Sequence, residues 1–283
     1  LATFFAVAAI YASIRWYRTG DARVFVAGAL AWGLGIATHP IVALLFPALA
    51  VLLLARLRSV TVRAFALALI AFFFGIAWYA YLPARSAAVT AARLDPTRSL
   101  GVPPGRPFWD NDHPASRQGF VKEVVGTEFS AGGAFADMLS PQTYAARFPY
   151  YWLLLIMEIT PVGVLLSFGG LYVLAKRDRL VAIALFFAWT FPTAFAFAYA
   201  IEADKQRYYL IGFSVLSALA AYGASAIVRA LPSLHRGILA VMAAVTIGLL
   251  VMNHTIFEQR ESRGAQAVIT TAIKNTPRNA LLI

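Results

Sequence analysis

The chain has 283 residues, of which 60% are hydrophobic and 13% are charged, and its mean hydropathy is +0.71. About a quarter of the residues of a soluble domain are charged, so this composition excludes a soluble globular protein and predicts an integral membrane protein. The lack of cysteine excludes disulfides, thiolate nucleophiles and cysteine metal sites. The formal net charge of +11 comes from arginines in short loops between apolar runs, which indicates membrane topology and anionic lipid and not nucleic acid.

Apolar runs close to the roughly 20 residues that cross about 30 Å of hydrocarbon recur along the chain. Arginine-rich loops follow every second run, and the positive-inside rule places these loops on the cytoplasmic side. The pattern predicts an all-α polytopic membrane protein with about eight membrane helices. We expect these helices at residues 1–17, 24–38, 41–54, 63–82, 150–175, 180–201, 208–228 and 237–252.

The sequence predicts four parts. These are membrane helices with a short hairpin at His39 in residues 1–83, a large outer-face insert with an interfacial helix in 84–149, four membrane helices in 150–253, and the start of a soluble outer α/β domain in 254–283. In the last part, helical spacing of apolar residues over 258–275 precedes a short apolar run typical of a buried strand. Because the chain begins and ends in apolar runs, we expect it to be a fragment of a longer protein. Three glycines in 24–35 suit close helix packing in lipid: Gly28, Gly33 and Gly35.

Thr38, His39 and Pro40 separate the two runs of the short hairpin. Proline is favoured at the first position of a helix because its missing N–H would have no partner there, and the residues before it can act as the cap. The helix from Pro40 would direct its free N–H groups, its dipole and the His39 imidazole at a recessed outer pocket, an arrangement that suits a phosphate group. The alternative is that His39 only caps a helix end near the interface.

Arg85 follows Tyr81-Leu82-Pro83-Ala84, where we expect a membrane helix to end at the outer face. A guanidinium just above the hydrocarbon can hold phosphate with two parallel hydrogen bonds. It can equally extend to lipid headgroups. The sequence therefore makes Arg85 a candidate substrate-binding residue.

Asp110 and Asp112 lie in the stiff run from Trp109 to Pro114, which also contains His113. Carboxylates beside an imidazole can act as a general base or bind a divalent metal. A plain structural turn is the alternative, because Asx residues and proline are ordinary turn formers. Apolar residues at helical spacing over 116–129 then predict a helix that lies flat on the membrane or packs on the bundle.

Glu158 is the only acid within an apparent membrane helix, and a carboxylate there is costly unless it is paired or neutralised. This cost makes it a candidate functional residue. Asp204 and Arg207 belong to a charged, tyrosine-rich segment that we expect on the outer face. They are candidate substrate contacts, and the alternative is a rim of surface ion pairs with a tyrosine belt.

Several of these local patterns together resemble the prokaryotic relatives of protein O-mannosyltransferases, a family of membrane glycosyltransferases of the GT-C type. The similar segments run in the family's order over nearly the whole chain. They are Gly33-Leu34-Gly35 to His39 with Pro47 beyond it, Tyr81-Leu82-Pro83-Ala84-Arg85, Trp109-Asp110 followed by Phe120 and Val125-Gly126-Thr127-Glu128-Phe129, Asp204 to Tyr209, and Ala265 to Asn279-Ala280-Leu281-Leu282. The turn after Trp109 is longer than the family's usual form.

The resemblance implies a multi-pass enzyme of the bacterial inner membrane that moves a sugar, mannose, from a polyprenyl-phosphate carrier to a protein or glycan acceptor on the outer face. It also implies that the catalytic carboxylate lies in an N-terminal outer loop that precedes this chain. The fragment would then supply carrier-phosphate contacts, and alone it would be inactive. A membrane transporter or lipid flippase is the alternative, since short broken helices and Glu158 also fit transport. A scaffold for an exported domain is a third hypothesis.

Overall fold

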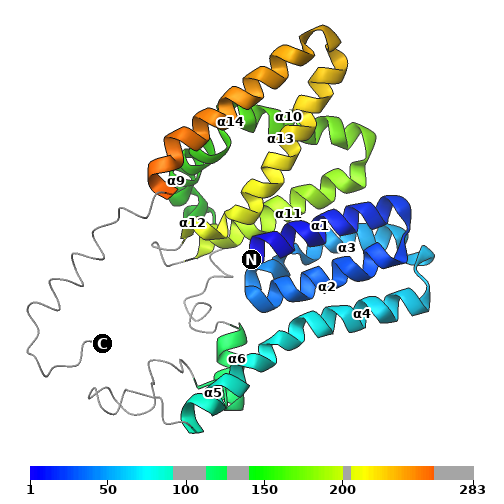
Figure 1. The fold of residues 1–283 in the computed structure, drawn as a ribbon, viewed down its shortest axis with the longest axis vertical. Helices are drawn as coiled ribbons and strands as arrows, with labels where there is room; N and C mark the ends of the chain where they lie inside the picture. The colour runs from blue at the N-terminus through cyan, green and yellow to red at the C-terminus, as the bar shows by residue number, and fades with distance from the viewer. Residues whose placement is uncertain (92–112, 126–139, 200–204, 258–283) are drawn as a thin grey trace, which may run out of the picture. The chain divides into compact units, whose positions relative to one another are not determined.

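The computed structural model describes residues 1–91, 113–125, 140–199 and 205–257 (Figure 1), and throughout these residues the chain forms helices and no strand. Two compact units are present, Leu1–Ala226 and Ile227–Ile283. The first unit contains α1 (Ala2–Thr19), α2 (Ala22–Thr38), the 3₁₀ helix η1 (Pro40–Leu45), α3 (Phe46–Arg56), η2 (Leu57–Ser59), α4 (Val62–Ile76), η3 (Ala77–Ala80), α5 (Tyr81–Ala91), α6 (Arg117–Val125), α9 (Pro141–Ile159), α10 (Pro161–Arg177), α11 (Arg179–Ala198), α12 (Lys205–Tyr208) and most of α13 (Leu210–Ala230). The described part of the second unit consists of the end of α13, η6 (Pro232–Leu234) and α14 (His235–Phe257).

Over its described residues the protein is all-α, and its long apolar helices are those of a membrane protein. Four helical stretches of the described chain are long and apolar enough to cross a bilayer: Pro40–Ser59, Val62–Ala91, Arg179–Ala198 and Leu210–Ala230. The bent pair α9 and α10 would make a fifth, whereas α2 and the first part of α14 are apolar but shorter. The sequence predicted about eight crossings, and that number stays a prediction. The predicted start of an α/β domain lies almost entirely in residues 258–283, outside the described residues.

Glycines hold the helices of the first unit at backbone contact. A side chain at Gly33 of α2 would overlap the carbonyl oxygen of Phe72 in α4, and one at Gly75 would overlap the backbone of Leu34. A Cβ at Gly35 would lie 2.7 Å from a side-chain carbon of Val42 in η1, and one at Gly28 would lie 3.1 Å from the Cβ of Ala12 in α1, so the predicted role of these glycines in close packing is confirmed. In lipid, where apolar side chains gain nothing by leaving water, such close approach is a main source of helix association.

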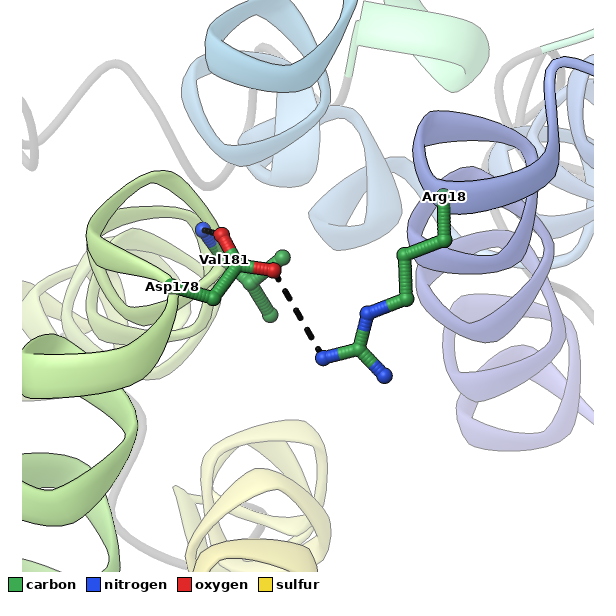
Figure 2. Close-up of polar contacts among 3 residues, drawn as sticks. All are labelled: Arg18, Asp178 and Val181. Atoms are coloured by element: carbon green, nitrogen blue, oxygen red, sulfur yellow. Dashed lines mark hydrogen bonds and ion pairs between the residues drawn. The ribbon is translucent and has the colours of Figure 1, made fainter.

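The arginine-rich connections gather at one end of the first unit, here called the basic end. The Arg56 guanidinium, at the end of α3, donates from Nη1 to the carbonyl oxygens of Trp16 and Tyr17 in the last turn of α1, at 3.3 and 2.9 Å, and the Trp16 carbonyl also accepts the Gly20 N–H. Arg18 of α1 forms an ion pair with Asp178 at 3.6 Å, and Figure 2 shows the two side chains extended toward each other. The other carboxylate oxygen of Asp178 accepts the Val181 N–H and caps α11. The sequence predicted that the arginine-rich connections lie on one face, and the contacts of Arg56 and Arg18 across these connections agree with that prediction.

Two helix boundaries differ from the expectation. The helical stretch that starts with α4 continues through η3 and α5 to Ala91, past Pro83 and Arg85, so the expected helix end just before Pro83 is wrong. Pro83 is tolerated because it lies in the first turn of α5, directly after the 3₁₀ turn η3, where its missing N–H disrupts least. On the other side of the insert, α9 begins at Pro141 and not at residue 150, with proline at its favoured first position.

The expected single helix over 150–175 is also wrong. The chain bends by 93° between α9 and α10, at Thr160. Pro161 disfavours helical backbone at the residue before it, and Thr160 adopts a φ of +66°. The Thr160 N–H closes α9 on the Ile156 carbonyl, and its hydroxyl accepts the Gly163 N–H to start α10. One residue therefore ends one helix and caps the next.

Candidate functional site at the His39 break

The break at His39 joins α2 to η1 at the end of the first unit away from the basic end. Pro40 disfavours helical backbone at His39, which is extended at φ −164° and ψ 128°. The His39 N–H donates to the Gly35 carbonyl at 3.0 Å and closes α2. The Tyr79 hydroxyl, from η3, donates to the Ile36 carbonyl at 2.7 Å and satisfies another open carbonyl of α2. The predicted break at His39 is confirmed.

His39 also starts η1. Its Nδ1 accepts the Ile41 N–H at 3.2 Å, and its carbonyl oxygen accepts the Val42 N–H at 3.1 Å. Pro40 has no N–H, so His39 itself uses the first two N–H groups of the new helix. The expectation that these groups stay free for a phosphate is wrong, because the cap residue folds back onto them, and η1 is a 3₁₀ helix and not the expected α-helix.

The hydrogen bond from Ile41 defines the state of the imidazole. An Nδ1 that accepts a hydrogen bond carries no proton, so the neutral ring carries its proton on Nε2. Burial lowers the pKa of His39, and the positive charge of Arg207 lowers it further. Nε2–H of the neutral ring is therefore a hydrogen-bond donor available to a ligand near physiological pH.

Tyr208 of α12 is the ring neighbour of His39, with centroids 5.3 Å apart at 65°. The ring of Tyr199, at the end of α11, is 4.4 Å from that of Tyr208, and Phe195 is 6.0 Å from it. Arg207 precedes Tyr208, has an exposed side chain, and acts on His39 through its charge. Thus the structure brings His39 and Arg207 together within an aromatic surround, which we call the His39 site.

Contacts from α9 hold α12 and the end of α11 in place. Gln206 Nε2 donates to the Tyr150 hydroxyl at 2.8 Å. Arg147 Nη1 donates to the carbonyl oxygens of Phe197 and Tyr199, which end α11. Sequence reasoning missed Arg147, although an arginine one turn before an aromatic apolar run was a signal for it. This guanidinium neutralises the helix terminus that positions Tyr199 beside Tyr208.

The other predicted site residues lie elsewhere or outside the described residues. Arg85 is exposed on α5, and the structure records no contact between it and His39 within the described chain. Glu158 is exposed near the end of α9, so the expected intramembrane carboxylate faces outward from the fold. The expected turn around Trp109, with Asp110 and Asp112, and the loop with Asp204 lie outside the described residues.

The described remainder of the insert packs on α5. The Ser86 hydroxyl, which is buried, accepts the Ala115 N–H at 3.0 Å, and the His113 carbonyl accepts the Ser116 hydroxyl at 3.0 Å. Helix α6 (Arg117–Val125) confirms the helix expected within 116–129. Within the residues that the structure describes, no group of three or more metal-ligating side chains lies close enough together to hold a metal ion.

The His39 site thus combines a neutral imidazole with an Nε2 donor, an arginine and tyrosine rings at the end of an apolar bundle. Such a set suits a small anion at a membrane interface. Comparison with protein-family models, with curated proteins and with solved structures finds no match for this chain.

Proposed function

We propose that this chain is part of a multi-pass glycosyltransferase of the bacterial inner membrane. It transfers a sugar, mannose, from a polyprenyl-phosphate carrier to a protein or glycan acceptor on the outer face. The helices α1, α2, η1 with α3, α4 with α5, α9 with α10, α11, α13 and α14 make the eight crossings of this proposal.

The observation that supports the proposal is that His39, at the end of the bundle opposite the basic end, contacts the ring of Tyr208, the residue next to Arg207. Arg207 supplies a permanent positive charge, and His39 supplies a neutral donor beside it. A phosphate monoanion or dianion binds well to such a pair because charge-assisted hydrogen bonds are about twice as strong as neutral ones. In this proposal the positive-inside rule assigns the arginine-rich basic end to the cytoplasm, so the His39 end would lie on the outer face, where a carrier-linked sugar would meet an exported acceptor.

Donor turnover by the full-length protein in proteoliposomes with polyprenyl-phosphate-mannose tests the proposal. We expect Arg207→Gln and His39→Asn to lower turnover by tenfold or more, because each removes a phosphate contact of about 1.5–3 kcal/mol. Asn at position 39 keeps an oxygen that can accept the Ile41 N–H, so the helix cap survives. Arg177→Gln, which removes an exposed charge at the end of α10, is the matched control and should leave turnover unchanged. Failure of the wild-type protein to consume donor would contradict the proposal.

The bend at Thr160 favours a second candidate function, transport of a polar solute or lipid. Broken helices at mid-bundle are typical of secondary transporters, and α9 and α10 meet at 93° with Glu158 two residues before the break. Counterflow of labelled solute in proteoliposomes tests this alternative. Uptake that Glu158→Gln abolishes would support it, and an absence of uptake with polar lipids and sugars would refute it.

A further inference from the structure

An apolar groove of about 320 Å³ lies on the first unit between α1, α2, α3 and α4. Six aromatic side chains line it: Trp16, Phe25, Trp32, Phe46, Phe65 and Phe72. Its depth comes from small residues on three helices, Gly28 and Ala29 of α2, Ala50 of α3 and Ala68 of α4. Phe46 is 60% exposed and Phe65 is 44% exposed, so the groove opens sideways toward the lipid.

The wall of the groove is held in place by side-chain contacts. Trp32 Nε1 donates to the Val42 carbonyl at 3.0 Å, which fixes the indole across the gap between α2 and η1. Its ring lies 4.8 Å from Phe72 and 6.1 Å from Phe46, measured between centroids. A wall with fixed aromatic rings keeps its shape without a ligand, which lowers the ordering cost of binding a chain there.

One end of the groove reaches the basic end. Trp16 and Leu53 line it, and Arg56 follows Leu53 by three residues on the same face of α3. The Arg56 guanidinium lies over the end of α1, within hydrogen-bond distance of the Trp16 and Tyr17 carbonyls. Arg58 follows in the connection to α4 and Arg63 in the first turn of α4, and both side chains are exposed. The middle of the groove is therefore apolar, and the end lined by Trp16 and Leu53 lies near positively charged side chains.

We propose that this groove binds one acyl chain of an anionic glycerophospholipid whose phosphate contacts Arg56, Arg58 and Arg63. The charge pattern argues for an anionic lipid over a zwitterionic one, since each basic residue near the surface adds about 1 kcal/mol toward anionic lipid. The groove lies toward the cytoplasmic leaflet of the proposed topology, whereas the His39 site lies at the other end. This lipid site therefore stands independently of the glycosyltransferase proposal.

Quenching of tryptophan fluorescence by brominated lipid tests the proposal, because Trp16 and Trp32 line the groove. The full chain is reconstituted in phosphatidylcholine vesicles with a fixed fraction of phosphatidylglycerol, with bromine on the acyl chains of one lipid or the other. We expect markedly stronger quenching from brominated phosphatidylglycerol, and a smaller quenched fraction in Trp32→Phe, which removes one groove indole.

Two pairs of variants sharpen the result. Ala50→Phe fills the groove and should abolish the preference, whereas Leu54→Phe on the exposed outer side of the same helix should not. Arg58→Gln with Arg63→Gln should weaken phosphatidylglycerol binding by about fivefold per arginine removed, as ~1 kcal/mol per charge requires. Arg177→Gln with Arg179→Gln removes two exposed charges at the α10–α11 turn, away from the groove residues, and should change little.

Equal quenching by the two brominated lipids would overturn the proposal. So would a preference that survives Ala50→Phe, because the bound lipid would then lie elsewhere. Weak quenching together with a change of oligomeric state in Ala50→Phe would show that a second copy of the chain covers the groove, and it too would overturn the proposal.

Discussion

The contact between α10 and α13 makes a sharp test of backbone-level packing in this protein. A Cβ added to Gly170 would overlap the carbonyl oxygen of Leu219 and lie 2.9 Å from the Gly223 nitrogen. Ordinary contacts of a Cβ begin near 3.4 Å, and both obstacles are backbone atoms that cannot turn aside. We therefore expect Gly170→Ala to push the two helices apart by on the order of 1 Å.

Such a separation has a calculable cost. A radial gap of about 0.5–1 Å loses roughly a quarter to a half of each affected dispersion contact, and overpacking of this kind costs about 1–3 kcal/mol. Gly169 is the matched control on the same helix, because its Cβ would meet nothing within 4 Å. Both changes gain helix propensity of up to about 1 kcal/mol, so this gain cancels in the comparison.

The free energies of unfolding of the two variants, from denaturant titration in detergent followed by circular dichroism, should differ by about 1–3 kcal/mol, with Gly170→Ala the less stable. Identical midpoints for Gly169→Ala and Gly170→Ala would refute the packing argument, because they would mean that α10 and α13 do not touch at this point.

Three further predictions concern helix ends. First, the pKa of His39 in the folded chain lies below its unfolded value of about 6.5, so the unfolded chain binds more protons near that pH. The free energy of unfolding should therefore fall as the pH drops from about 7.5 through 6.5 toward the folded pKa. His39→Asn should flatten this part of the pH–stability curve, and an unchanged slope would refute the lowered pKa of His39. Second, Arg56→Gln removes the donor to the Trp16 and Tyr17 carbonyls and should destabilise by about 1–3 kcal/mol, whereas the nearby exposed change Arg58→Gln should stay within about 0.5 kcal/mol when unfolding is measured in detergent. Third, Asp178→Ala should lower the free energy of unfolding more than Arg18→Ala does. It removes the α11 cap, worth about 0.5–2 kcal/mol, as well as an exposed ion pair worth under about 1 kcal/mol. Equal losses in the same titration would show that the cap contributes nothing.

The local features of the fold were predictable from short stretches of sequence. Pro40 predicted the break at His39 because proline acts on its immediate neighbour through fixed sterics. Glycines predicted close packing because only they let two backbones touch. The same reasoning failed at Pro83, since a proline in a first turn ends nothing, and at Thr160, where apolar continuity concealed a bend of 93°.

The His39 site was predictable only in part. His39 and Arg207 were each identified from their local surroundings, but their proximity depends on how α12 packs against α11 and the α2 terminus. Hydrophobic periodicity reports which face of a helix is buried and not which helix covers it. Arg147 was not predicted from the sequence, because its guanidinium binds carbonyl groups about 50 positions away in the chain.

The glycine contact between α10 and α13 also has a consequence for biosynthesis. About 50 residues, including all of α11, separate Gly170 from Gly223. At roughly 5–20 residues per second, the ribosome needs about 3–10 s to supply the second glycine after the first. Until α13 is made, the Gly170 contact of α10 cannot form, whereas α1 and α2 adjoin in the sequence and pack on each other. We therefore expect α1 and α2 to pack before α10 gains its contact with α13.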